Sequence, residues 1–97
     1  MDKHELKART DARTDEWKRN LDIMKAKAAA ATGDAKVKYT QTVAQLQTQF
    51  DEFKVEAAKA WDSADSTWDK TSADLQRTWA EWELRAKSAW NELTKQM

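Results

Sequence analysis

The chain of 97 residues contains no proline and a single glycine, Gly33. Sheets and domains of many helices reverse direction through turns that rely on these two residues, so this chain has few places to turn. Residues that favour helices are abundant, and threonine is the only common β-branched residue. The sequence therefore predicts an all-α fold of one or two long helices, forming a single domain over residues 1–97 with residues 1–5 frayed.

Nearly all the large apolar side chains fall on one side of a helical wheel, within a sector of roughly 140° at about 100° per residue. Four apolar residues lie outside this sector and form a second, narrow row on the wheel: Ile23, Val37, Val55 and Leu84. A single helix cannot cover its own apolar stripe, so we expect copies of the chain to self-associate through it. The members of this apolar stripe that we expect to mediate self-association are Trp17, Leu21, Met24, Tyr39, Val43, Leu46, Phe50, Phe53, Trp61, Trp68, Leu75, Trp79, Trp82, Trp90 and Leu93.

The stripe also has a period of its own. Eleven residues in three turns give about 3.67 residues per turn, so helices that pack through such a repeat run nearly straight or with a slight right-handed supercoil. The pattern predicts a hendecad-type coiled-coil oligomer. Two series of positions follow this spacing of eleven residues: Leu6, Trp17, Ala28, Tyr39, Phe50 and Trp61, and then Leu46, Ala57, Trp68, Trp79 and Trp90.

The one candidate boundary is Thr32-Gly33-Asp34, where the glycine could end one helix and the aspartate could cap the next. The stripe keeps its phase across this point, which a loop would have no reason to preserve. The pattern therefore favours one unbroken amphipathic helix, about 140 Å long at 1.5 Å per residue. A helical hairpin that turns at Gly33 is the alternative.

Charge is balanced overall but not along the chain. Seventeen basic and seventeen acidic residues cancel, which argues against nucleic acid as a partner. Residues 1–38 carry ten basic and seven acidic side chains, net +3, whereas residues 39–97 carry seven basic and ten acidic, net −3. An antiparallel pair of chains sets these halves against each other, so antiparallel self-association is slightly favoured.

The sequence offers no combination of residues for catalysis, a metal or a cofactor. There is no cysteine, His4 is the only histidine, and no nucleophile–base pair or glycine-rich phosphate loop is present. Acidic residues spaced for salt bridges, such as Glu83 with Lys87, indicate a solvated helix face. We therefore expect a non-enzymatic protein. No stretch approaches the roughly 20 apolar residues of a membrane span, and a cytoplasmic location is expected.

The six tryptophans allow two interpretations. They could form the core of the oligomer, or they could anchor a helix that lies flat on a membrane surface. Interfacial helices usually line their polar face with lysine and arginine, whereas residues 61–97 are mostly acidic there, which favours the core. Docking on a membrane surface that protects bilayers, and an adaptor that receives helices of another protein, remain alternatives.

Three short motifs resemble a known family. They are Asp15-Glu16-Trp17, then Ala35-Lys36-Val37-Lys38-Tyr39 with its tyrosine twenty-two residues after Trp17, then Trp68-Asp69 followed by Trp79. Across approximately residues 5–85 the chain is similar to a group of short bacterial coiled-coil proteins, a cyanobacterial-type stress-response family whose molecular activity is undefined. The resemblance implies a role in stress tolerance without catalysis, and it supplies no active-site residues. The sequence departs from the family at Gly33 and in the additional Trp61, Trp82 and Trp90.

Overall fold

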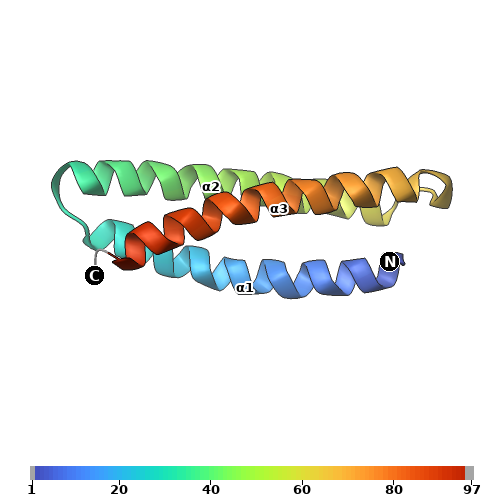
Figure 1. The fold of residues 1–97 in the computed structure, drawn as a ribbon, viewed down its shortest axis with the longest axis horizontal. Helices are drawn as coiled ribbons and strands as arrows, with labels where there is room; N and C mark the ends of the chain where they lie inside the picture. Colours follow the sequence, from blue (N-terminus) through green and yellow to red (C-terminus); the bar gives the residue numbers. More distant parts are fainter. Residues whose placement is uncertain (1, 96–97) are drawn as a thin grey trace.

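In a computed structural model, which describes residues 2–95, the chain forms three helices joined by two short loops (Figure 1). The helices are α1 (Lys3–Ala30), α2 (Gly33–Trp61) and α3 (Asp65–Lys95). Successive helices run in opposite directions, so α1 and α3 are parallel, and the bundle measures 52 × 18 × 16 Å. The all-α prediction is confirmed, whereas the prediction of one unbroken helix is wrong.

The first break lies where the alternative hairpin was placed, just before Gly33. Ala31 and Thr32 have extended backbone, with ψ of 161° and 158°. Gly33 begins α2 with φ of 64°, a left-handed conformation that costs a residue with a Cβ about 1–2 kcal/mol. A Cβ at this position would meet no atom within 4 Å, so the backbone conformation rather than crowding requires the glycine. Ala31 and Thr32 therefore end one helix and let the chain reverse direction, although the apolar stripe keeps its phase from α1 to α2.

The second break, at residues 62–64, has neither glycine nor proline. The Ser63 hydroxyl donates to the Ala60 carbonyl at 2.7 Å and closes the end of α2. On the other side of the loop, the Thr67 hydroxyl donates to the Ala64 carbonyl at 3.0 Å. Side chains that bond to nearby backbone in this way compete with helical hydrogen bonds and favour helix ends. Hydroxyl bonds of this kind accompany the turn, and they also occur inside unbroken helices, as from Thr14 to the Asp11 carbonyl.

The beginning of α1 is well anchored. The Asp2 carboxylate accepts a hydrogen bond of 2.8 Å from a backbone N–H of the first turn and caps the helix. The Lys3 ammonium donates to the Ser63 carbonyl at 2.8 Å, which ties the helix to the second loop. Helix α1 thus begins at Lys3, within the range 1–5 that was predicted to fray, and Met1 lies outside the described residues.

The core of the bundle is the apolar stripe folded upon itself. Leu21, Met24 and Phe50 are its largest fully buried side chains. All three helices contribute to the core, and each covers the apolar faces of the other two. Burial of this apolar surface stabilises the fold by about 25 cal/mol for each Å² removed from water. The four side chains predicted to lie outside the stripe are exposed, with fractions between 43% and 71%: Ile23, Val37, Val55 and Leu84.

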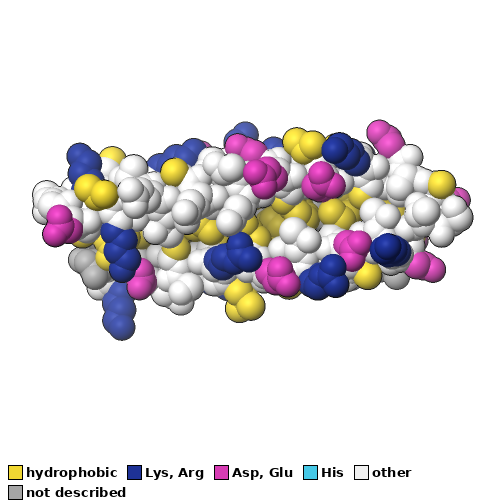
Figure 2. Space-filling view, turned by 90° about the horizontal axis from the view of Figure 1, so that it is seen from above, with side chains coloured by type: hydrophobic (Ala, Val, Ile, Leu, Met, Phe, Trp, Pro, Cys, Tyr) yellow, Lys and Arg dark blue, Asp and Glu magenta, His cyan; other side chains and the backbone are white. Residues whose placement is uncertain are grey.

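The surface mixes both signs of charge. Figure 2 shows basic and acidic side chains interspersed over one face, with hydrophobic side chains visible along the furrow between the helices. Among residues 2–95, no helix has an apolar stretch long enough to cross a bilayer.

Candidate functional site

The side chains predicted to mediate self-association lie inside the bundle. Twelve of the fifteen are buried, and Trp61, Trp79 and Trp90 are half-buried. One chain thus covers its own stripe, and the hendecad coiled-coil oligomer is not needed to keep these side chains from water. The buried members are Trp17, Leu21, Met24, Tyr39, Val43, Leu46, Phe50, Phe53, Trp68, Leu75, Trp82 and Leu93.

Five rings from all three helices form one aromatic cluster, made of Trp17, Phe50, Phe53, Trp79 and Trp82. The Trp82 ring lies at its centre, with centroids 5.3 Å from Trp17, 5.4 Å from Phe50 and 5.1 Å from Trp79. The contact with Trp17 is edge-on, with an interplanar angle of 85°, an arrangement that ring quadrupoles favour. Phe53 joins the cluster through Trp79, at 5.1 Å. The cluster holds the middle of the bundle together.

The indole nitrogens of this region differ in their hydrogen bonds. Trp82 Nε1 donates to the Leu46 carbonyl at 3.0 Å within the core, and Trp17 Nε1 donates to Glu83 at 3.0 Å. The nitrogens of Trp68 and Trp79 are buried and have no hydrogen-bond partner among the described residues. Because an unpaired buried donor carries an uncompensated desolvation cost, these two sites are the least satisfied part of the core.

Glu83 in α3 is the most enclosed acidic group in an ion pair of the described chain, with 14% of its side chain exposed. Arg13 Nη1 in α1 lies 2.9 Å and 3.0 Å from its two oxygens, and Lys87 Nζ lies 3.7 Å away. Burial raises the pKa of the Glu83 carboxyl, but the hydrogen bond from Trp17 and the positive charge of Arg13 outweigh burial and hold the pKa below its usual value. The carboxylate is therefore charged at neutral pH.

Local spacing shows only part of this network. The pair of Glu83 with Lys87, predicted from its helical spacing, is present at 3.7 Å. The shorter contacts come from Arg13 and Trp17, which belong to another helix, and no pattern along the chain connects them to Glu83. Sequence reasoning therefore placed Glu83 on a solvated face and missed its role between helices.

The described residues contain no group of three or more His, Cys, Asp or Glu side chains arranged to hold a metal ion. Fold and site together define an antiparallel three-helix bundle with an aromatic cluster and one enclosed carboxylate. Comparison of the chain with protein-family models, curated proteins and solved structures gave no match. The resemblance to the bacterial stress-response family therefore stays a prediction.

Proposed function

We propose that this chain is a cytoplasmic, non-catalytic, stress-associated protein that self-associates by opening its bundle and exchanging α1 with a second copy. The observation that carries the proposal is the phase of the apolar stripe across the first loop. The spacing of eleven residues continues from Trp17 in α1 to Tyr39 and Phe50 in α2. A chain that also forms one helix from α1 and α2 requires this shared phase. The spacing is kept across the second loop as well, from Ala57 to Trp68, so the contacts of the two loops decide which of them opens.

The exchange preserves the core. In the opened chain, α1 continues into α2 as one helix and packs on α2 and α3 of the other copy. The contact of Trp17 with Trp82 is then made between chains, whereas the other contacts of the aromatic cluster stay within α2 and α3 of one chain. Because every contact is kept, exchange of an element is a low-cost route to dimers. The charges are also compatible, because the basic first third still packs on acidic later residues.

The first loop is the better hinge of the two. It consists of Ala31 and Thr32, and the Thr32 side chain makes no capping hydrogen bond to α2. The second loop is held by the Ser63 and Thr67 hydroxyls and by Lys3. Short hinge loops favour exchange, because straightening them requires only a few backbone angles to change.

The stress association rests on the family resemblance alone.

The experiment that tests the proposal is Gly33→Ala, followed by size exclusion with light scattering. Alanine disfavours the left-handed backbone of the closed loop by about 1–2 kcal/mol and favours a continuous helix by about 1 kcal/mol. The expected result is a larger dimer fraction than in the wild type. Gly33→Asn is the matched control, because asparagine adopts left-handed backbone more readily, and it should leave the dimer fraction nearer the wild-type value.

Single-chain mass for Gly33→Ala over the whole concentration range would contradict the proposal. The same measurement with phosphatidylglycerol-containing vesicles separates it from the membrane-surface alternative. Flotation with the vesicles and a blue shift of tryptophan fluorescence, without dimers in their absence, would replace self-association by lipid docking.

A further inference from the structure

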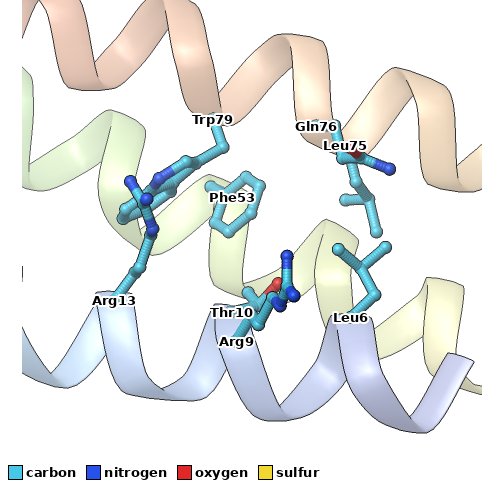
Figure 3. Close-up of a pocket in the computed structure, with 8 residues that line it drawn as sticks. All are labelled: Leu6, Arg9, Thr10, Arg13, Phe53, Leu75, Gln76 and Trp79. Atoms are coloured by element: carbon cyan, nitrogen blue, oxygen red, sulfur yellow. The ribbon is translucent and has the colours of Figure 1, made fainter. Parts of the chain in front are cut away.

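A cavity of about 200 Å³ opens between α1 and α3, near the beginning of α1 (Figure 3). Its apolar walls come from all three helices: Leu6 from α1, Phe53 from α2, and Leu75 and Trp79 from α3. Figure 3 shows these side chains converging between the ribbons. An apolar cavity of about 150 Å³ can hold benzene, so this volume suits one aromatic ring with a small substituent.

The polar side chains that line the cavity include two arginines and no acid. Arg9, Thr10 and Arg13 project from α1, and Gln76 lies opposite on α3. Arg13 uses Nη1 for its ion pair with Glu83, which leaves its Nε and Nη2 donors. The Arg9 side chain makes no hydrogen bond or ion pair with other residues of the range 2–95. The opening is therefore rich in cationic donors.

A further donor lies in the wall itself. Trp79 Nε1 is buried and unpaired among the described residues, although the ring of Trp79 packs at 5.1 Å on Phe53. A protein that buries an indole N–H normally supplies an acceptor for it. The Arg9 guanidinium and this N–H have no acceptor among the described residues, and Arg13 keeps donors beyond its ion pair with Glu83. The neighbouring rings provide an aromatic surface.

We propose that this cavity binds a small aromatic carboxylate, with its ring against Phe53 and Trp79 and its carboxylate toward Arg9 and Arg13. A guanidinium presents its donors in a planar fork that matches a carboxylate. A neutral aromatic compound would leave the cationic donors unmatched, and a long acyl chain exceeds the volume. The site does not depend on the exchange of helices, because all its walls belong to the closed bundle.

The proposal is tested by titrating benzoate into ¹⁵N-labelled protein and following the six indole N–H resonances. The expected result is a saturable shift of the Trp79 resonance in the millimolar range, which is typical of so small a ligand. Benzamide has the same shape without the charge, and it should bind about tenfold or more weakly. Trp90, which does not line the cavity, serves as the internal reference.

Two variants locate the carboxylate. Arg9→Gln removes one guanidinium from an exposed position that the core does not use, and it should lower the benzoate affinity about tenfold. Arg85→Gln changes an exposed arginine of α3 outside the cavity and should leave the affinity unchanged. An unmoved Trp79 resonance, equal affinities for benzoate and benzamide, or an unaltered affinity in Arg9→Gln would each overturn the proposal.

Discussion

The indole nitrogen of Trp17 in α1 donates a hydrogen bond of 3.0 Å to Glu83 in α3, although the two residues are 66 positions apart. Arg13, one helical turn before Trp17, binds the same carboxylate at 2.9 Å. The two helices are not consecutive in the chain, so this contact helps to set the position of α1 against the hairpin formed by α2 and α3. A mostly enclosed charge is stable only with its partners, so the loss of Glu83 should lower the stability of the whole bundle.

Glu83→Ala should lower the free energy of unfolding by about 2 kcal/mol, because the buried Trp17 N–H loses its acceptor. Glu83→Gln should cost less, since its amide oxygen can still accept that hydrogen bond. Urea denaturation followed by circular dichroism measures both changes. Glu81→Ala, at an exposed position two residues earlier, is the control and should stay within about 0.5 kcal/mol of the wild type. Equal losses in Glu81→Ala and Glu83→Ala would contradict this account.

Acid should remove the contribution of Glu83 charge to stability. The folded-state pKa of Glu83 lies below its unfolded value, so this contribution is complete above about pH 4.3 and disappears as the pH falls through the folded pKa. The difference in unfolding free energy between the wild type and Glu83→Gln should therefore shrink on acidification. Urea titrations between about pH 7 and pH 2 measure it. A difference that stays constant over this range would show that the charge of Glu83 is not what stabilises the bundle.

The two neighbouring tryptophans of α3 should respond differently to phenylalanine. Trp82→Phe deletes the buried hydrogen bond to the Leu46 carbonyl, whereas Trp79→Phe removes a donor that has no partner among the described residues. Both variants lose ring area, and Trp82 is the more deeply buried ring, so the lost area and the lost hydrogen bond act in the same direction. Trp82→Phe should be the more destabilising by about 1 kcal/mol, as measured by urea denaturation. The reverse order would mean that the Trp79 nitrogen finds an acceptor in solution.

Lys3→Ala should loosen the second loop. The ammonium of Lys3 bonds to the Ser63 carbonyl at 2.8 Å, lies 3.8 Å from Asp65, and sits 5.2 Å above the Trp68 ring. Asp65 is fully exposed and Lys3 is partly exposed, so these contacts are weak and the effect should be local. Hydrogen exchange should quicken at residues 62–67 and little elsewhere. Lys7→Ala, at an exposed site one turn later in α1, is the matched control, and equal exchange in the two variants would contradict a role for Lys3.

The helices and the buried face were predictable from the sequence because both depend on local chemistry. The period of the apolar stripe determines which side chains avoid water, whether another chain or another helix of the same chain covers them. It could not distinguish these two cases, and this is why one long helix was expected. Gly33 at least marked the first turn. The second turn is marked only by aspartate, serine and threonine, among them Asp62, Ser63 and Thr67, and residues of these types also occur on exposed helix faces.

The enclosed carboxylate could not be foreseen for a different reason. The partners of Glu83 come from a helix that becomes its neighbour only after the chain has turned twice. The spacing of charges predicts contacts along one helix, and Lys87 is the single partner that it shows.

An odd number of helices leaves the start of α1 and the end of α3 at opposite poles of the molecule (Figure 1). The start of α1 therefore lies at the same pole as the second loop, where Lys3 bonds to the Ser63 carbonyl at 2.8 Å, and fluorophores attached at these two places would be close together in the closed bundle. Straightening the first loop places α1 and α2 end to end, so the start of α1 and the second loop would be separated by both helices, 28 and 29 residues, or about 85 Å at 1.5 Å per residue. Energy transfer within one doubly labelled chain would thus register the opening directly, even when the partner copy carries no label.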